Sequence, residues 1–391
     1  MNKKIIILGS TGSIGKTTLE IINENKNKFD VKLLSTNRNI KSIYKQSKKF
    51  KVKNIIIHNT KTFQNYKNFF IKKKINVFNS VNEFKKKNTG KVDYTMSAII
   101  GIPGLKPTLD VISCSKNIAI ANKESIICGW NLINKQLLKN RTKFIPIDSE
   151  HFSIAQLIKD ENKLNINKIY ITASGGPFLQ TNFLNLKKFN PNNAIKHPTW
   201  KMGKKISIDS ATLINKIFEL IEAKKIFDLD YSKFEILIQP TSYVHGIVDF
   251  KNGVSKILTH PTSMKIPIYN AIIQSSKKNY FSNKIDIKLM NNLNFQKIDK
   301  RNFPVEKLLK FIPKADSLFE TILVSANDTL VELFLERKIK FFQIYKILFK
   351  ILKLKEFQKF KKLLPKNVTQ IGDLSNKVRL KTIALSVKSH V

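Results

Sequence analysis

Short apolar runs alternate with polar or helix-like stretches through the first 150 residues of this 391-residue chain. Six of them have the length of strands: KIIIL (4–8), VKLLST (31–36), NIIIH (54–58), YTMSAII (94–100), NIAIAN (117–122) and KFIPI (143–147). A continuous apolar run of this length is typical of a strand buried on both faces. Strands that alternate with helices predict an α/β domain built on a parallel sheet.

The pattern changes after about residue 150. NKIYITAS (167–174) predicts a strand, and the periodicity of 206–227 predicts one long helix with Ile214, Phe218 and Ile221 on its apolar stripe. Three more strands, separated by short turns, are predicted in FEILIQP, YVHGIVDF and VSKILTH, which together span 234–260. This combination indicates a second domain of the α+β class.

The last third of the chain favours helices. Residues 277–300 are polar and lack a clear period, so we interpret them as a linker. The segments at 305–312, 318–338 and 341–353 have helical periodicity. The predicted organisation is an N-terminal domain over 1–149, a central domain over 150–276, the linker, and a helical domain over 301–391.

The loop after the first apolar run, GSTGSIGKTT (9–18), allows two interpretations. A phosphate-binding P-loop needs glycine five residues before Gly15, but Ser10 stands there. The three glycines Gly9, Gly12 and Gly15 instead follow a strand and open a helix, which is typical of a dinucleotide-binding turn. A purely structural glycine turn is the alternative.

The end of the second predicted strand indicates which dinucleotide would bind. NAD sites usually place an acid there for the ribose 2′-hydroxyl, but STNRN (35–39) contains none. Arg38 is one of only five arginines in the chain and could pair with a 2′-phosphate. This stretch therefore favours NADP.

A second constellation follows the strand at 143–147. Asp148 and Glu150 lie two residues apart, so in extended chain both point to one side, and their oxygens suit Mg²⁺ or Mn²⁺. Helix-capping acids are the alternative. On the predicted long helix, Asn215, Lys216 and Glu219 share one face, although such a face could also be a solvated surface.

Two serines are candidates for binding phosphate. Ser174 stands beside paired glycines in ASGGPF (173–178), a plausible turn for phosphate contact. Ser210 lies near the start of the predicted helix, where the helix dipole favours an anion.

The composition adds a strong positive charge. The net charge is +42, with 70 Lys and Arg against 28 Asp and Glu. Basic chains often bind nucleic acid, but the excess is mostly Lys, is spread along the chain, and is accompanied by many Asn, Ile and Phe, as A/T-rich codons would produce.

No run approaches the ~20 apolar residues of a membrane span. Cys114 and Cys128 are too few for a disulfide framework and fit a reducing cytosol. The first strand begins within a few residues of Met1, so we expect no targeting segment and a cytoplasmic location.

Taken in order, GSTGSIG, ANKES (121–125), DSEH (148–151), SGGPF (174–178) and HPTWKMGKKISIDSATLINK (197–216) resemble the 1-deoxy-D-xylulose 5-phosphate reductoisomerase family. The resemblance covers nearly the whole chain, and the motif at 197–216 is its most specific part. It implies a Rossmann-like NADP-binding domain, a central catalytic domain, a C-terminal helical domain and a homodimer. It also implies rearrangement of the sugar phosphate to an aldehyde, which NADPH then reduces.

The resemblance assigns roles to individual residues. It implies that Asp148, Glu150 and Glu219 hold one Mg²⁺, Mn²⁺ or Co²⁺ ion beside the reacting substrate oxygens. Phosphate contacts would come from Ser174, Ser210, Asn215 and Lys216, and contacts to the substrate hydroxyls from Lys123, Glu124 and Ser149. His197, Trp200 and Met202 would belong to a loop that closes over the site. Cofactor contacts would come from Thr11, Gly12, Ser13, Ile14, Arg38, Asn39, Asn122, Glu124 and Gly203.

Three other classes of protein fit the sequence less well. A short-chain reductase needs a Tyr-x-x-x-Lys pair in its catalytic helix, but the pairs Tyr44–Lys48 and Tyr280–Lys284 lie elsewhere. A semialdehyde dehydrogenase needs a nucleophilic cysteine, but both cysteines stand in apolar surroundings. A nucleic-acid-binding protein would gather arginines or aromatics in a groove-reading arrangement, and no segment does so.

Overall fold

The chain folds into two compact units. The structure is a computed structural model that describes residues 2–179, 189–200, 202–273, 285–299 and 303–387. The first unit comprises Met1–Asp148 and Met264–Ser276, and the second comprises Ser149–Ser263 and Lys277–Val391. The described residues 264–273, which the sequence prediction placed in the central domain, thus belong to the N-terminal unit.

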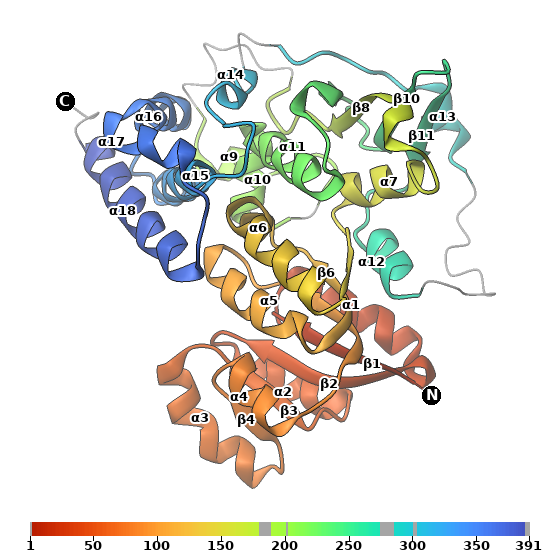
Figure 1. The fold of residues 1–391 in the computed structure, drawn as a ribbon, viewed down its shortest axis with the longest axis vertical. Coiled ribbons are helices and arrows are strands. Elements are labelled where there is room, and N and C mark those ends of the chain that lie inside the picture. Colours follow the sequence, from red (N-terminus) through yellow and green to blue (C-terminus); the bar gives the residue numbers. More distant parts are fainter. Residues whose placement is uncertain (1, 180–188, 201, 274–284, 300–302, 388–391) are drawn as a thin grey trace. The chain divides into compact units, whose positions relative to one another are not determined.

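A parallel seven-stranded sheet forms the centre of the first unit (Figure 1), with the order β4-β3-β2-β1-β5-β6-β7. Its strands are β1 Lys3–Leu8, β2 Phe29–Thr36, β3 Asn54–Ile57, β4 Asn76–Phe78, β5 Val92–Ser97, β6 Ser115–Ile120 and β7 Lys143–Ile145. Ile5, Ile6 and Ile7 are all fully buried, as expected for a strand covered on both faces. The six predicted strands are therefore confirmed, and the short β4 was missed.

Helices connect these strands, as parallel pairing requires. They are α1 Ser13–Glu24, α2 Ile40–Lys49, α3 Thr60–Lys72, α4 Val81–Lys87, α5 Leu105–Ile112 and α6 Lys123–Lys139, and α12 Lys265–Ile272 packs on α1. The chain leaves β1 toward β2 on one side and returns to β5 on the other. Ligands of such sheets bind where the strand order reverses in this way, at the carboxyl ends. The Rossmann-like prediction is confirmed.

A mixed four-stranded sheet with the order β11-β10-β8-β9 forms the second unit's β layer. Its strands are β8 Ile166–Ala173, β9 Phe234–Ile238, β10 Val244–Phe250 and β11 Ser255–Thr259. The helix α7 (Ser149–Leu157) packs on β10 and β11. All four predicted strands are confirmed.

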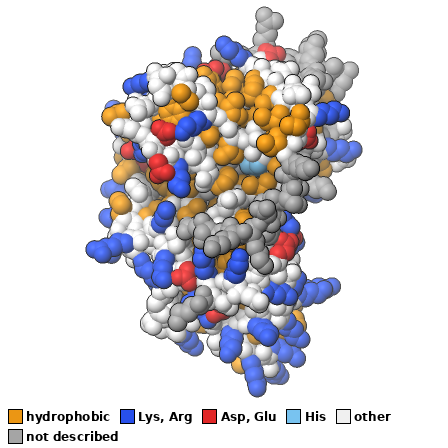
Figure 2. All heavy atoms as spheres, turned by 90° about the vertical axis from the view of Figure 1, so that its right-hand side faces the viewer, with side chains coloured by type: hydrophobic (Ala, Val, Ile, Leu, Met, Phe, Trp, Pro, Cys, Tyr) orange, Lys and Arg blue, Asp and Glu red, His pale blue; other side chains and the backbone are white. Residues whose placement is uncertain are grey.

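The outer face of this sheet carries apolar side chains at its edge. Tyr170 pairs with Ile247, and Ile247 pairs with Ile257 on the edge strand β11. Ile257 is 48% exposed, and Ile287 on α13 (Ile287–Asn291) is 62% exposed. Figure 2, which faces the side where β11 and α13 lie, shows hydrophobic side chains gathered there. Within the described residues β11 is the edge strand of this sheet, and such an edge beside exposed apolar side chains is a surface suited to association.

The long helix predicted over 206–227 is wrong. Two helices, α10 (Lys204–Ala211) and α11 (Ile214–Phe227), meet at Leu213, whose φ of 54° is left-handed. The apolar period runs through the break, and leucine gives no sequence signal for a left-handed residue, so the pattern hid it. The break places Asn215 and Lys216 in the first turn of a new helix.

Further helices belong to the described part of the second unit. They are α9 Pro191–Ala194, α13, α14 Glu306–Leu309, α15 Phe319–Leu335, α16 Phe341–Lys353, α17 Lys355–Gln358 and α18 Val368–Val387. The helix α15 is buried along most of its length and packs on α16 and α18. In the predicted linker, the described residues 285–299 form α13 and one bridge between Gln296 and Ile238.

Candidate active site

The glycine loop between β1 and α1 is tightly packed. A Cβ atom on Gly9 would lie 2.5 Å from the carbonyl oxygen of Ala98, and one on Gly15 would lie 2.4 Å from that of Gly9. Gly9 also has a φ of 76°, which favours glycine. Because the N-cap residue Gly12 has no side chain, the first-turn N–H groups of α1 remain available to an anion. These features fit a dinucleotide pyrophosphate.

The last residues of β2 hold this loop in place. The Gly9 amide donates to Ser35 Oγ at 2.9 Å, and the Ser10 amide donates to the Ser35 carbonyl at 2.9 Å. Thr11 Oγ1 lies 2.9 Å from Thr36 Oγ1. The predicted contact residues Ser13, Arg38 and Asn39 are exposed, and Asn39 also caps α2. Arg38 thus lies directly after the strand end where an NADP 2′-phosphate would bind.

The predicted site residues at the start of α6 have structural partners. Asn122 caps the helix by accepting from the Ser125 amide at 2.9 Å, and its amide donates to Gly101 O at 2.8 Å. Glu124 is buried. The ammonium of Lys123 donates to the carboxylate of Asp148. Lys123 and Asp148, two residues that the sequence analysis names for the site, are therefore in direct contact.

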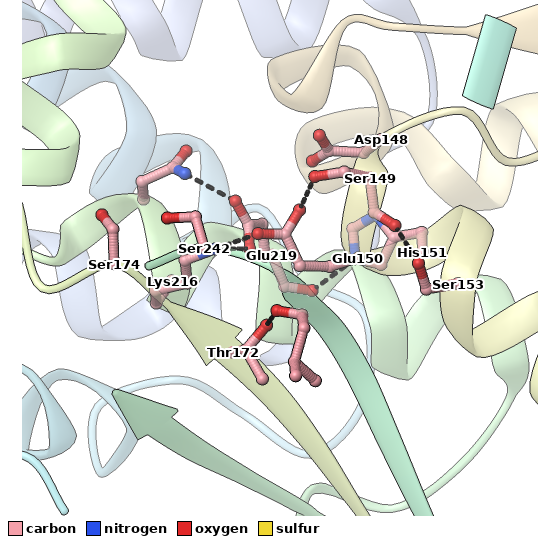
Figure 3. A network of polar contacts seen from close by, with 12 residues as sticks. Asp148, Ser149, Glu150, His151, Ser153, Thr172, Ser174, Lys216, Glu219 and Ser242 are labelled. Carbon is pink, nitrogen blue, oxygen red and sulfur yellow. Dashed lines mark hydrogen bonds and ion pairs between the residues drawn. The ribbon is translucent and has the colours of Figure 1, made fainter. Parts of the chain in front are cut away.

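A buried polar cluster joins α7 and α11 in the second unit (Figure 3). Lys216 Nζ donates to Glu219 Oε2 at 2.6 Å and also to Glu150 Oε1. Asn215 Nδ2 donates to Glu219 Oε1 at 2.5 Å, and Ser149 Oγ donates to Glu150 Oε2 at 2.5 Å. The shared helix face of Asn215, Lys216 and Glu219 is confirmed, and it is buried rather than solvated.

Electrostatics hold the ammonium of this cluster. Burial acts to lower the pKa of Lys216, but the carboxylates of Glu150 and Glu219 outweigh it, so the pKa is raised above its usual value. Lys216 therefore stays charged at neutral pH. A charged group between two carboxylates is the arrangement that burial of three ionisable side chains requires.

Asp148 extends this cluster, because a single peptide bond joins it to the first residue of α7. Ligand oxygens of Asp148, Glu150 and Glu219 all lie within 4.8 Å of one another. The ligand atoms of Asp148, His151 and Glu222 satisfy the same limit. The first group offers only carboxylate oxygens, the ligands that Mg²⁺ prefers, whereas the second includes an imidazole nitrogen. The first group therefore fits magnesium better.

Ser174 follows β8 and is oriented by two donors. His197 Nδ1 accepts from the Trp200 amide at 2.9 Å, so the ring proton lies on Nε2, which donates to Ser174 Oγ at 3.0 Å. The Gly176 amide also donates to Ser174 Oγ, at 3.2 Å. Burial, with the nearby Lys216 charge, lowers the pKa of His197 to about 4, so the ring is neutral at pH 7. The hydroxyl proton of Ser174 is then left to donate to another group.

Ser210 lies elsewhere than predicted. It stands in the last turn of α10, not near the start of a helix, so the dipole argument for an anion at Ser210 is wrong. That argument applies to Asn215 and Lys216, which lie in the first turn of α11. A Cβ atom on Gly176 would lie 2.9 Å from the Ser210 carbonyl oxygen, so the glycine turn packs against this end of α10.

The remaining predicted residues precede α10. Trp200 and Met202 are partly exposed, and Gly203 is the exposed N-cap of α10. The Trp200 ring meets His245 edge-on, with ring centroids 6.0 Å apart. The neighbouring Thr199 Oγ1 lies 3.1 Å from Ser242 Oγ.

The sequence prediction missed two contributors to this cluster. His151 Nε2 lies 2.8 Å from the carbonyl oxygen of Glu219 and so ties α7 to α11. Its position in DSEH was a signal that could have identified it. Ser242, which contacts the segment before α10, follows a predicted strand and had no motif to mark it.

Family models match three parts of the chain. The model of 1-deoxy-D-xylulose 5-phosphate reductoisomerase matches residues 5–129, and that of its C-terminal domain matches 144–227. A further model, the DXP reductoisomerase C-terminal domain, matches 260–381. Together they span most of the chain, including the glycine loop between β1 and α1 and the buried polar cluster of α7 and α11.

Whole proteins of the same name are similar over almost the full length. The 1-deoxy-D-xylulose 5-phosphate reductoisomerase of Pelagibacter ubique (strain HTCC1062) is 52% identical over 387 residues, covering 98% of this chain and 100% of that protein. The Wolbachia pipientis wMel enzyme is 36% identical and covers 88% and 89%.

Solved structures agree with the sequences. The Zymomonas mobilis 1-deoxy-D-xylulose 5-phosphate reductoisomerase in complex with NADPH superimposes with a TM-score of 0.86 at 30% identity, covering 99% of both chains. A DOX-P reductoisomerase in complex with NADPH, fosmidomycin and magnesium gives 0.89 at 29% identity, covering 99% and 98%.

Proposed function

The chain belongs to the 1-deoxy-D-xylulose 5-phosphate reductoisomerase family, and from this premise we propose which of its residues carry the reaction. The activity is the NADPH- and divalent-metal-dependent rearrangement and reduction of 1-deoxy-D-xylulose 5-phosphate to 2-C-methyl-D-erythritol 4-phosphate, a step of non-mevalonate isoprenoid precursor biosynthesis. One observation carries the residue assignment: in a buried cluster, the ammonium of Lys216 donates to the carboxylates of both Glu150 and Glu219.

Asp148, Glu150 and Glu219 are proposed to hold the magnesium ion. Their proximity and their all-oxygen donor set support this. When bound, the ion supplies Lewis-acid polarisation of substrate oxygens. Asn215 and Lys216 orient the Glu219 carboxylate, and the hydroxyl of Ser149 orients that of Glu150. Ligand carboxylates fixed by such hydrogen bonds keep their geometry when the substrate arrives.

Ser174, Ser210, Asn215 and Lys216 are proposed to bind the substrate phosphate. The support for Ser174 is its hydroxyl proton, which is free to donate because both lone pairs of the oxygen accept from His197 and Gly176. Asn215 and Lys216 lie in the first turn of α11, where the helix dipole attracts an anion. A phosphate there would meet neutral and cationic donors together.

Lys123 and Ser149 are proposed to contact the substrate hydroxyls, and His197, Trp200 and Met202 to belong to the segment that covers the substrate. The position of the latter three before α10, with His197 bonded to Ser174, supports this assignment. Covering the substrate excludes water, which protects the aldehyde before its reduction.

The NADPH contacts are proposed to come from the glycine loop and its neighbours. The residues are Thr11, Gly12, Ser13, Ile14, Arg38, Asn39, Asn122, Glu124 and Gly203. The narrow cradle at Gly9 and Gly15, and the free N-terminus of α1, support pyrophosphate binding at this loop. Asn122 contributes indirectly, because its hydrogen bond with the Ser125 amide caps α6 and fixes the start of that helix.

The phosphate assignment has a direct test. Ser174→Ala removes the donor, so the KM for 1-deoxy-D-xylulose 5-phosphate rises about tenfold while the KM for NADPH stays the same. Inorganic phosphate is also expected to lose its competitive inhibition. Ser153→Ala is the matched control, because Ser153 lies in α7 and donates to the Ser149 carbonyl at 2.7 Å. Unchanged inhibition by phosphate in Ser174→Ala would contradict the assignment.

A homodimer in the cytoplasm is the proposed state of the enzyme, with Mn²⁺ or Co²⁺ able to replace Mg²⁺ in it. Exposed Ile257 on β11, an edge strand of the described sheet, supports association with a second copy. Two buried free cysteines, Cys114 and Cys128, are compatible with a reducing compartment. Among the described residues, no helix has the length and apolar character needed to cross a membrane. We also propose that the boundaries between the NADPH-binding domain, the catalytic domain, the linker and the helical domain follow residues 149, 276 and 300.

A further inference from the structure

The break between α10 and α11 is a strained element beside the proposed phosphate site. Leu213 has a φ of 54°, although it is neither glycine nor asparagine, and its side chain is buried. A left-handed leucine persists only where its surroundings hold it in place. The contacts that hold Leu213 therefore determine where Asn215 and Lys216 lie.

The break removes one bond from the helical ladder. In a continuous helix the Lys216 amide would donate to the Thr212 carbonyl, but here it donates to Leu213 O at 3.1 Å. Thr212 is fully buried, so its carbonyl needs another donor. The hydroxyl of Tyr345, on α16, donates to it.

A second contact from the C-terminal helices supports the same segment. Asn327 on α15 donates to Asp209 Oδ1 at 2.7 Å, in the last turn of α10. Both Asn327 and Asp209 are buried. The helices α15 and α16 thus hold the end of α10 and the break itself.

We propose that Tyr345 is a positioning residue for substrate phosphate binding, acting through the Thr212 carbonyl at the break before α11. This rests on the proposed phosphate role of Asn215 and Lys216. The hydroxyl of Tyr345 stabilises the left-handed turn, and the turn sets the direction from which the first residues of α11 meet the anion. The C-terminal helices thereby contribute to substrate affinity without touching the substrate.

The test is Tyr345→Phe, which keeps the ring and its stacking on Phe349 but removes the donor. The KM for 1-deoxy-D-xylulose 5-phosphate and the inhibition constant of inorganic phosphate are expected to rise about tenfold. The KM for NADPH and kcat at saturating substrate stay near their wild-type values. A general loss of structure would instead change all four.

Tyr94→Phe is the matched control, because Tyr94 is also buried and its hydroxyl has no hydrogen-bond partner within the described residues. Its constants should equal those of the wild type. If Tyr345→Phe does not fold, Asn327→Ala carries the test through the second contact and predicts the same selective rise. Wild-type phosphate affinity in a folded Tyr345→Phe overturns the inference. Loss of phosphate inhibition in Lys216→Met but not in Tyr345→Phe would refute only the role of Tyr345. No loss in Lys216→Met would refute the proposed phosphate role of Lys216, on which the inference rests.

Discussion

Replacing Glu219 by Gln separates the two candidate metal groups, which share Asp148. Glu219 belongs to the all-carboxylate group and Glu222 to the group with His151, and both lie buried on α11. Glu219→Gln keeps the side-chain shape and can still accept from Asn215 or Lys216, but it removes one anionic ligand. We expect Glu219→Gln to abolish magnesium binding and Glu222→Gln to retain it.

The magnitude follows from linkage between binding and folding. Magnesium at about 100 times its dissociation constant stabilises the folded protein by roughly 2.7 kcal/mol. For a folding unit of about 150–250 residues, this corresponds to an increase in Tm of roughly 5–10 °C. Thermal unfolding with and without MgCl₂, followed by circular dichroism, measures this shift. The metal-free Glu219→Gln protein itself loses about 1–3 kcal/mol, because Lys216 keeps a neutral partner in place of a charged one.

The outcome distinguishes the groups without any enzyme assay. Wild type and Glu222→Gln should show the full increase in Tm with magnesium, and Glu219→Gln should show none. A full increase in Glu219→Gln, or its loss in Glu222→Gln alone, would refute the assignment of the metal to Asp148, Glu150 and Glu219.

Three further predictions concern other parts of the molecule. Burial lowers the pKa of His58 to about 4; since its folded pKa lies below the unfolded value of about 6.5, stability is retained above pH 6.5 and lost as the pH falls toward 4. Between pH 8 and pH 5 the wild type should lose about 2 kcal/mol more than His58→Gln in urea unfolding, and equal losses would contradict the shift. Arg38→Ala should weaken binding of NADPH about tenfold and leave that of NADH unchanged, as measured by quenching of protein fluorescence; equal effects on both would exclude a 2′-phosphate contact. Ile257→Lys should convert a dimer to a monomer in light scattering, and a dimer in that variant would place the interface elsewhere.

The sheet of the first unit could be predicted because its strands carry strong local signals. Runs such as KIIIL are buried on both faces and end at glycine or polar turns, so composition and period agree. β4 was missed because three residues, Asn76–Phe78, carry too little pattern. Local signals also located α15 and α16, whose apolar residues follow a helical period.

The break at Leu213 could not be predicted, because the contact that we propose to stabilise it is tertiary. The donor that satisfies the Thr212 carbonyl, Tyr345, lies 133 residues further along the chain. The predicted position of Ser210 was wrong for the same reason, because its place near a helix start depended on a single long helix. By contrast, the spacing of Asn215, Lys216 and Glu219 survives the break, because all three lie on the C-terminal side of it.

The most direct test of the account is the chelator-sensitive consumption of NADPH. The purified protein is incubated with 1-deoxy-D-xylulose 5-phosphate, MgCl₂ and NADPH, and absorbance at the nicotinamide band is followed while mass spectrometry quantifies 2-C-methyl-D-erythritol 4-phosphate. One product molecule should form for each NADPH oxidised, EDTA should stop the reaction, and added Mg²⁺ should restore it. Absence of product, or NADPH oxidation that EDTA does not affect, would contradict the assignment of a metal-dependent reductoisomerase.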